Sequence, residues 1–325
     1  SMVARSKSAV AMALVLRVVH SEPRTWGLVP LPAEALPTAW VFSRGVNIDT
    51  NYHTTRSMGS SDPFPDHAID DIAYLSRSKN RIRILAALAT GAYMRRELGE
   101  ETGVSRTTLD RIINELEERD WVHRTADGDY TATPTGERIT VESTRFVGAI
   151  EAIHGLGEAV SWLPDEELTV GLRHFSDATV LRPQPNATAA PSTYVTQLLQ
   201  EATEFACLVN TPPSLGFEDA MIRGVSSGRL TTKHVITDGE IDVLRQNPER
   251  TRRWQSYVDA GAELYCYDGS IPCNILIIDE TVIILDRQPK ALEGIESTSM
   301  AIHSWAHEMI EKYKQDSKRL EPSAF

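Results

Sequence analysis

The stretch from residue 92 to residue 124 constrains the fold most, because its apolar residues repeat with helical spacing on both sides of one turn. Gly103 stands at that turn and permits the left-handed or tight backbone through which two helices meet at a steep angle. Ser105 follows as the expected N-cap, its hydroxyl accepting a free amide of the second helix. The apolar positions of that helix recur at i, i+3, i+4 and i+7 and are Leu109, Ile112, Ile113 and Leu116.

The surface of this helix pair indicates what it could contact. The buried side of the first half is expected to comprise Met94, Leu98, Thr102 and Val104. The residues that face outward near the start of the second helix are Arg106, Thr107, Asp110 and Arg111. In a helix-turn-helix, these N-terminal residues of the second helix meet base edges in the DNA major groove. Two packed helices of an ordinary bundle are the alternative interpretation.

Two short strand-like runs after the helices favour the DNA-binding interpretation. Residues 121–124 and 130–133 flank a turn with an Asp127-Gly128 pair, as in a β-hairpin. Helix, turn, helix and hairpin in this order resemble the winged helix of archaeal and bacterial transcriptional regulators. The turn and Arg124 would then contact the DNA backbone or the minor groove. The predicted DNA-binding residues are Arg95, Ser105, Arg106, Thr107, Asp110, Arg111 and Arg124.

The net charge of the chain, -12 at pH 7, opposes attraction to phosphate. Either basic residues gather on one face, or the protein works at high salt, where that attraction is screened in any case. The basic residues around the helix pair are nearly all arginine, which suits bidentate contacts with phosphate and guanine. Those that precede it either reach the DNA backbone or line a solvated helix face; they are Arg77, Lys79, Arg81 and Arg83.

The first 66 residues fit poorly with the rest of the chain, since they show no sustained period. Ser1-Met2 has the form of an expression-tag remnant, and Met58 is a candidate natural start. We expect residues 1–66 to be a disordered or non-native extension. A length of 325 residues leaves room for two domains after it.

The remaining chain divides into three predicted parts of an α+β protein. Residues 67–135 form the winged helix-turn-helix domain, and residues 136–163 form a linker and dimerisation helix that runs to Trp162. Residues 164–325 alternate strands and helices, which predicts an α/β domain with a largely parallel sheet. An antiparallel hairpin through Asp279-Glu280 and a closing helix over residues 297–318 complete it.

A ligand site is expected in the α/β domain outside the carboxyl ends of its parallel strands. This rule selects polar residues suited to a small hydroxylated or anionic molecule, although polar loop residues without a function are the simpler alternative. The selected residues are Asn210, Thr211, Asp238, Tyr267, Asp268 and Arg287.

The order of elements, with NILIIDETVIILD before the closing helix, resembles archaeal regulators of the TrmB type and the related methanogenesis-filamentation regulators. The resemblance covers about residues 69–320 and implies a second domain similar to half of a phospholipase-D fold. That fold is catalytic through a His-x-Lys-x4-Asp motif. Here the corresponding stretch is Pro272-Cys273-Asn274, without histidine or lysine before Asp279, so the resemblance implies that hydrolysis has been lost.

Two further residue pairs have both a functional and a structural interpretation. His303 and His307 lie one helical turn apart and could share a metal ion with a third ligand, but a helix-packing face is the favoured interpretation. Cys266 and Cys273 are placed on neighbouring strands and could form a redox pair, but an inert core thiol is favoured. We therefore expect no metal site and no cofactor.

These expectations combine into one function: a cytoplasmic, homodimeric regulator that binds double-stranded DNA and whose α/β domain senses a small-molecule effector. Three cysteines without paired spacing indicate a reducing compartment, and no membrane partner is expected. The protein is not expected to be an enzyme. The alternative is a degenerate phosphodiesterase or a metal-dependent hydrolase that uses His303 and His307.

Overall fold

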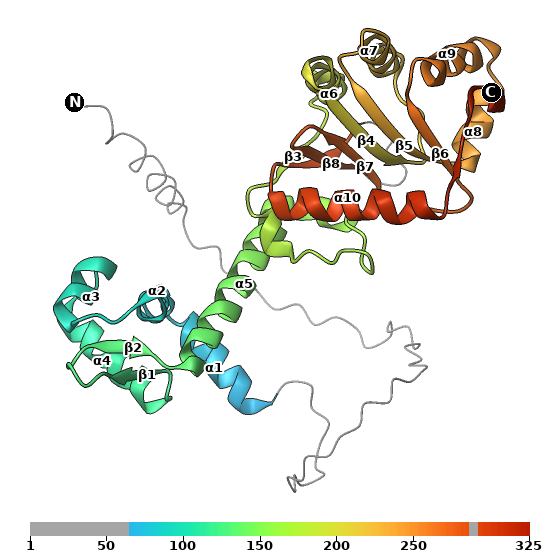
Figure 1. Cartoon of the computed structure of the whole chain (residues 1–325). Coiled ribbons are helices and arrows are strands. Elements are labelled where there is room, and N and C mark those ends of the chain that lie inside the picture. The colour runs from blue at the N-terminus through green and yellow to red at the C-terminus, as the bar shows by residue number, and fades with distance from the viewer. Residues whose placement is uncertain (1–64, 286–291) are drawn as a thin grey trace, which may run out of the picture. The chain divides into compact units, whose positions relative to one another are not determined.

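The computed structural model describes residues 65–285 and 292–325 (Figure 1). The predictions for residues 1–64, including the disordered extension and the start at Met58, therefore lie outside the described residues, as does Arg287. In the first part of the described chain, four helices precede a two-stranded antiparallel hairpin and a long helix. These elements are α1 (Asp66–Ser76), α2 (Lys79–Thr90), α3 (Arg95–Thr102), α4 (Arg106–Glu118), β1 (Val122–Arg124), β2 (Tyr130–Ala132) and α5 (Pro134–Leu156).

The turn between α3 and α4 has the predicted cause. Gly103 adopts the left-handed conformation, with φ of 66°, and its amide donates to the carbonyl of Gly99. The predicted apolar stripe of α4 is confirmed, since each of its four residues is at most 2% exposed. It packs with Leu98 and Trp121 into one hydrophobic cluster of the first part. The helix pair and the hairpin thus share a core of their own.

Three details in this part differ from the predictions. The Ser105 hydroxyl makes no cap bond to the α4 backbone and instead donates to Thr108 Oγ1 at 3.1 Å. Met94 is exposed, because it stands at the N-cap of α3 before the helix face begins. Arg81 is 7% exposed and pairs with Glu115 at 3.0 Å, so it serves the core and is not placed to reach a DNA backbone.

Helix α5 begins where the sequence indicated and ends earlier. Thr133 caps its first turn by accepting from the amide of Gly136. Gly136 lies against the hairpin side of the core, where a Cβ atom would come within 2.0 Å of the Trp121 carbonyl oxygen. The helix stops at Leu156 because Gly157 has φ of 56°, and a 3-10 turn, η1 (Gly157–Trp162), follows. The continuous helix predicted to Trp162 is therefore wrong in its last turn.

An eight-stranded sheet organises the second part, in the order β10-β6-β5-β4-β7-β8-β9-β3. Only the central pairings β4–β5 and β5–β6 are parallel, and all other pairings are antiparallel. The strands are β3 (Thr179–Leu181), β4 (Glu204–Val209), β5 (Thr231–Thr237), β6 (Glu263–Tyr267), β7 (Asn274–Ile278), β8 (Thr281–Leu285), β9 (Gly294–Ser297) and β10 (Lys318–Arg319).

The prediction of a largely parallel sheet is wrong, because β7 pairs antiparallel with β4 and the strands beyond it, β8, β9 and β3, are also paired antiparallel. The predicted hairpin is confirmed: Asp279 and Glu280 join β7 to β8, and a connection this short forces antiparallel pairing. Strand β9 was not predicted, and the closing helix, predicted from residue 297, begins only at Met300 because Ser297 ends β9.

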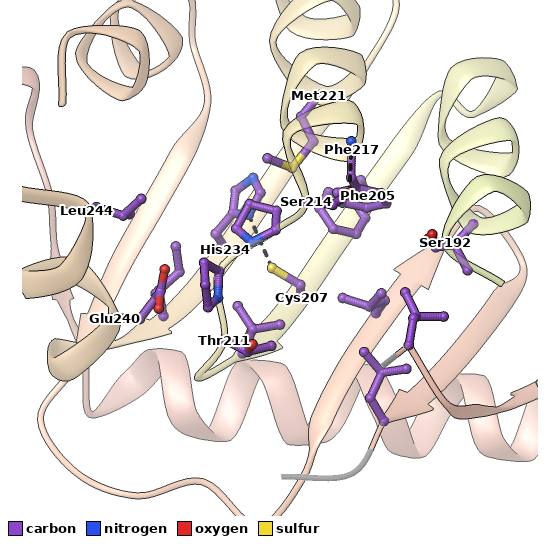
Figure 2. Close-up of a pocket in the computed structure, with 18 of the residues that line it drawn as sticks. Ser192, Phe205, Cys207, Thr211, Ser214, Phe217, Met221, His234, Glu240 and Leu244 are labelled. Atoms are coloured by element: carbon purple, nitrogen blue, oxygen red, sulfur yellow. Dashed lines mark hydrogen bonds between the residues drawn. The ribbon is translucent and has the colours of Figure 1, made fainter. Parts of the chain in front are cut away.

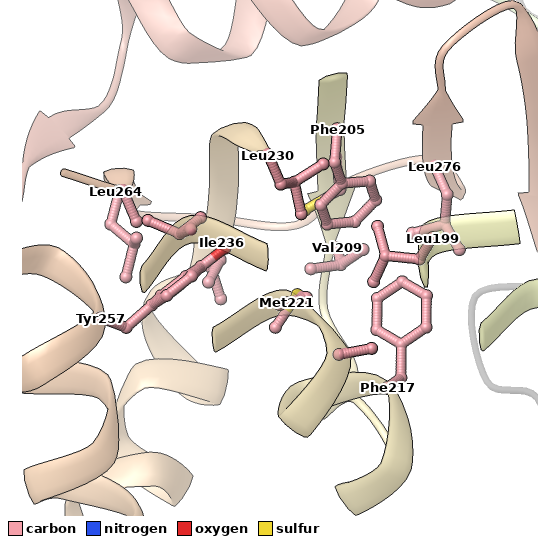
Figure 3. Packing of buried hydrophobic residues seen from close by; sticks show 14 of the residues in the cluster. Leu199, Phe205, Val209, Phe217, Met221, Leu230, Ile236, Tyr257, Leu264 and Leu276 are labelled. Carbon is pink, nitrogen blue, oxygen red and sulfur yellow. The ribbon is translucent and has the colours of Figure 1, made fainter. Parts of the chain in front are cut away.

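Helices cover both faces of this sheet (Figure 1). Alternate residues of β4 point to opposite sides: Phe205 and Cys207 enter the cluster beneath helices α6–α9, and Leu208 enters the cluster beneath α10. Figure 3 shows the first cluster, in which the rings of Phe205 and Phe217 meet edge-on, 5.5 Å between centroids. The covering elements are α6 (Ala190–Glu201), α7 (Leu215–Ser226), α8 (Asp238–Arg245), α9 (Pro248–Asp259), α10 (Met300–Gln315), η2 (Leu172–Phe175) and η3 (Pro322–Ala324).

Helices in the described part of the chain are all too short or too polar to cross a bilayer.

Candidate functional site

The first turn of α4 presents the most exposed of the predicted DNA-binding residues. The side chain of Arg106 is 95% exposed and has only a distant ion-pair partner, Asp110, at 4.0 Å. Ser105 and Thr107 beside it are also exposed. Because the apolar stripe fixes α4 on the core, this turn is held in a defined orientation with its polar side chains in solvent. A free guanidinium here can bind phosphate or the edge of guanine.

Arg95 and Asp110 differ from Arg106, because the protein itself uses both. Arg95 Nη1 donates to Asp110 Oδ1 at 2.8 Å, while its Nε and Nη2 donate to the hydroxyl of Tyr130. This contact joins α3, α4 and β2. Burial lowers the pKa of Arg95, but the hydrogen bonds that Arg95 donates to Tyr130 and the charge of Asp110 outweigh it, so the pKa is raised. Both residues are therefore positioned mainly to hold the surface, with Asp110 already neutralised.

Arg111 and Arg124 lie at the margins of the same surface. Arg111 Nη1 donates to Glu115 Oε1 at 2.6 Å along the exposed face of α4. Arg124 Nε donates to the carbonyl of Gly128 at 2.9 Å, so its exposed guanidinium stands at the tip of the hairpin. Gly128 has φ of 94°, and a side chain there would approach Arg124. The hairpin turn thus sets the position of one arginine.

The predicted ligand residues do not form one site. Strands β4, β5 and β6 do end side by side, but most polar groups at their ends have partners within the protein. The backbone amide of Asn210 donates to Asn274 Oδ1, whereas the buried side-chain oxygen of Asn210 has no partner among the described residues. The ring of Tyr267 packs edge-on against Tyr313, the exposed Asp238 accepts from the Gly239 amide, and Asp268 is exposed on the loop after β6. Of the five predicted residues that the structure describes, only Thr211 lines the cavity beyond β4.

That cavity has a volume of about 310 Å³ and lies between the sheet and helices α6–α9 (Figure 2). Pro212 and Ser214, which are exposed, also line it, so it opens to solvent beyond the end of β4. Its walls are mainly apolar and include Phe205, Val209, Phe217, Met221, Ile236 and Leu276. A concave, mainly apolar cavity with a few polar groups is typical of small-molecule sites.

A directed chain of hydrogen bonds lies in one wall of the cavity. The Tyr257 hydroxyl donates to Thr232 Oγ1 at 2.9 Å, so its oxygen accepts from His234 Nε2, also at 2.9 Å. The proton of the neutral imidazole is then on Nε2, and Nδ1 accepts from the Cys207 thiol at 3.1 Å (Figure 2). The four side chains satisfy one another inside the core.

The pKa shifts of the hydrogen-bonded side chains favour the neutral form of each one. Burial lowers the pKa of His234 to about 3 and raises the pKa of the Cys207 thiol far above its usual range. A thiolate–imidazolium pair, the reactive form of a cysteine nucleophile, is therefore disfavoured. The same environment raises the pKa of Tyr257. The arrangement suits a structural wall more than nucleophilic chemistry.

Two polar atoms on residues that line the cavity have no hydrogen-bond partner among the described residues. They are Oε1 of Glu240, a residue 5% exposed, and Nε1 of Trp254, a residue 1% exposed. Burial raises the pKa of Glu240 to about 7, against the opposing charge of Arg250. Buried polar groups in proteins are nearly always paired, so these two atoms are candidates for contact with a bound molecule.

The two residue pairs singled out in the sequence have local roles. His303 Nε2 lies 3.0 Å from the carbonyl oxygen of Asp279 and so donates to it, and the rings of His303 and His307 meet edge-on. Within residues 65–285 and 292–325, no cluster of three metal-binding side chains occurs. Cys266 and Cys273 do not lie on neighbouring strands, because β5 and β4 separate β6 from β7. The predicted placement of the two cysteines on neighbouring strands is therefore wrong.

Sequence reasoning missed Cys207, His234 and Glu240, which line the cavity. One signal for His234 was present: a histidine in the apolar run of β5, where an unpaired imidazole would be costly. No comparable signal marked Glu240, whose burial depends on how α8 packs against α9.

Comparisons with known proteins match the first part of the chain to one family. Residues 69–154 match the model of the HVO_A0261 N-terminal domain, and no curated protein matches the chain. Among solved structures, one similar protein is TrmBL2, described as an archaeal chromatin protein with a novel mode of DNA binding. Its sequence is 16% identical, the TM-score is 0.36, and the match covers 77% of this chain and 99% of that chain. Nuc, a phospholipase D family member from Salmonella typhimurium, has 14% identity and a TM-score of 0.34, over 44% of this chain and 99% of that chain. Similarity at this level does not assign a function.

Proposed function

We propose that the protein is a transcriptional regulator that binds double-stranded DNA through a winged helix-turn-helix formed by α3, α4 and the β1–β2 hairpin. The observation that carries the proposal is the first turn of α4. It rests on a rigid apolar stripe and offers the free guanidinium of Arg106 beside Ser105 and Thr107. Major-groove recognition requires this combination of a fixed helix and unengaged polar groups at its N-terminus.

We assign the predicted DNA-binding residues different roles according to their contacts within the protein. Arg106 and Thr107 would read bases, whereas Arg95 and Asp110, which bond each other, would hold the surface together. Arg124 at the hairpin tip would contact the backbone. Arg111 must leave or share its ion pair with Glu115 to reach DNA, which makes its contribution smaller.

Dimerisation through α5 completes the proposal, because two half-sites on DNA need two recognition helices at a fixed spacing. Phe146, Ile150 and Ile153 follow one another at i, i+4 and i+7 on this helix, and their exposed fractions are 58%, 39% and 36%. An apolar stripe of this spacing is the seam of a helix pair. A second copy of α5 would cover it.

The α/β domain is proposed to sense a small-molecule effector in its cavity, and no catalytic role is assigned to it. Such sensing requires that the effector bind the DNA-bound and free states with different affinity. The neutral Cys207–His234 pair favours binding over nucleophilic chemistry.

Fluorescence anisotropy with two labelled duplexes tests the proposal: the region upstream of the protein's own gene and a scrambled duplex of equal composition. We expect preference for the first, and loss of that preference in Arg106→Ala, since a bidentate contact to guanine contributes about 1–3 kcal/mol. Arg252→Ala, an exposed arginine on α9, is the matched control and should bind like the parent. Equal affinity for both duplexes across a salt series would refute sequence-specific binding.

A further inference from the structure

The cavity beneath α6–α9 is matched to a restricted class of molecule. Its apolar walls exclude a strongly charged or sugar-like ligand, because polar hydroxyls against Phe205, Phe217 and Leu276 would lose their hydrogen bonds to water. An engineered apolar cavity of roughly 150 Å³ holds one benzene molecule. A volume of about 310 Å³ therefore suits two fused rings or a chain of similar size.

The unpaired polar atoms of Trp254 and Glu240 indicate which functional group a ligand of this cavity would carry. The indole nitrogen of Trp254 can only donate a hydrogen bond, so its partner must be an acceptor. Oε1 of Glu240 has no partner among the described residues either, and it can accept a hydrogen bond. A hydroxyl group accepts one hydrogen bond and donates another, so a single hydroxyl can serve both needs.

The remaining polar groups of the wall do not compete for the ligand. His234 and Cys207 are committed to the chain that ends at Tyr257 and Thr232. The hydroxyl-bearing residues Ser192, Thr211 and Ser214 also line the cavity, but the buried polar atoms on its lining residues that have no partner within the described chain are those of Glu240 and Trp254.

We propose that the cavity binds a small, largely apolar molecule with one hydroxyl group, of the class of phenols and naphthols. This inference rests on the effector-sensing part of the proposed function and names the ligand class for the same cavity. The rings pack against Phe205, Phe217 and Met221, and the hydroxyl lies between Glu240 and Trp254.

Isothermal titration calorimetry of the full chain with 2-naphthol tests the proposal. We expect saturable binding with one site per chain, and at least tenfold weaker binding of 2-methoxynaphthalene, which has the same rings and cannot donate a hydrogen bond. The anion 2-naphthoate should also bind at least tenfold more weakly, since its charge would enter an apolar space beside a carboxyl group.

Three variants locate the site. Glu240→Leu should weaken 2-naphthol binding at least tenfold and remove the preference over 2-methoxynaphthalene. Met221→Trp should abolish binding by filling the cavity; because it can disturb the core, Ser192→Trp, at a half-buried position at the margin of the cavity, provides a second block. Glu249→Gln, an exposed carboxyl on α9, should bind like the parent.

The outcomes separate this inference from the proposed function. Absence of 2-naphthol binding, equal binding of the methoxy compound, or unchanged binding in both tryptophan variants would overturn the ligand class while DNA recognition stood. Binding of 2-naphthol as described by a protein that has no preference among duplexes would uphold the ligand class and refute the regulator.

Discussion

The guanidinium of Arg95 holds the hydroxyl of Tyr130 in a fork, with Nε at 3.1 Å and Nη2 at 2.7 Å. Tyr130 is 4% exposed and belongs to the core, so the fork connects the start of α3 to β2. An arginine that the sequence assigned to DNA is thus a clamp between the helix pair and the hairpin. Its partner Asp110 extends the clamp to α4.

Replacing Arg95 should therefore mainly reduce the stability of the fold, and its effect on DNA recognition should be secondary. Arg95→Ala leaves the Tyr130 hydroxyl and Asp110 without their partner, and we expect a loss of about 1–2 kcal/mol in the free energy of unfolding. Arg96→Ala, whose side chain is 83% exposed on the same helix, should change it by less than about 0.5 kcal/mol. Urea denaturation of both variants distinguishes the roles; equal losses would contradict the clamp.

Replacing two glycines of α5 with alanine should change the stability of the protein in opposite directions. A methyl group at Gly136 would meet the Trp121 carbonyl at 2.0 Å, so Gly136→Ala should destabilise the chain by about 1–3 kcal/mol or more. Gly155 has open space around its Cβ position, and Gly155→Ala should stabilise the helix by about 0.5–1 kcal/mol. Thermal unfolding monitored by circular dichroism checks both signs. A stabilised Gly136→Ala would show that the helix and hairpin are not in this contact.

The buried carboxylate of Glu218 depends on two arginines of α9. Its side chain is 0% exposed and accepts from Arg250 Nη2 at 2.6 Å and from Arg253 Nε at 2.9 Å. Arg250→Met should cost about 3 kcal/mol, because the charge of Glu218 stays buried with one partner fewer. Adding Glu218→Gln to that variant should restore part of the loss. A double variant as unstable as the sum of the two single variants would show that the pair is not coupled.

Glu240 should make stability decline as pH rises. Its pKa is about 7 in the folded chain and near its ordinary value of 4.5 in the unfolded chain, so between these values only the folded chain keeps the proton. The free energy of unfolding should then fall across this window, by on the order of 3 kcal/mol at most. Glu240→Gln should lack this dependence, and Glu249→Gln should keep it, in urea titrations at pH 5 and pH 8.

His234 should make the stability of the protein decline as the pH falls, the opposite of the trend expected from Glu240. Its pKa is about 3 in the folded chain against an ordinary value of 6.5, so the unfolded chain takes up the proton first as the pH falls. Stability should therefore decline below about pH 6.5 and continue to decline towards pH 3. His234→Phe should be less stable at neutral pH, having lost two hydrogen bonds, and should lose less on acidification. If this variant lost as much stability on acidification as the parent, groups other than His234 would be responsible for the decline.

Periodicity located most elements of the fold, because burial and helix or strand geometry repeat together. The α4 stripe, the β7–β8 hairpin and the start of α5 at Pro134 follow from residues within a few positions of one another. Strand direction in the sheet does not, since it depends on which strands meet: β7 pairs with β4 across more than sixty intervening positions. The four residues of β9 carried too little pattern to be predicted as a strand.

The sequence predicted those parts of the candidate sites that depend on local spacing and missed those that depend on long-range packing. The exposed first turn of α4 follows from helical spacing, so Arg106 could be placed, but the roles of Arg95 and Asp110 depend on Tyr130 in the later hairpin. The rule for strand ends led to the loop after β4 and found Thr211. Glu240 and Trp254 line the same cavity only because α8 and α9, which carry them, both pack on the sheet.

The sheet ends at one side in the three residues of β3 and at the other in the two residues of β10, Lys318 and Arg319. Such brief margins, one of them positively charged, leave almost no unpaired backbone for another chain to extend. In the described part of the chain, neither margin of this sheet offers a long flat strand to a second molecule, and the charge on β10 opposes fibrous assembly through that edge.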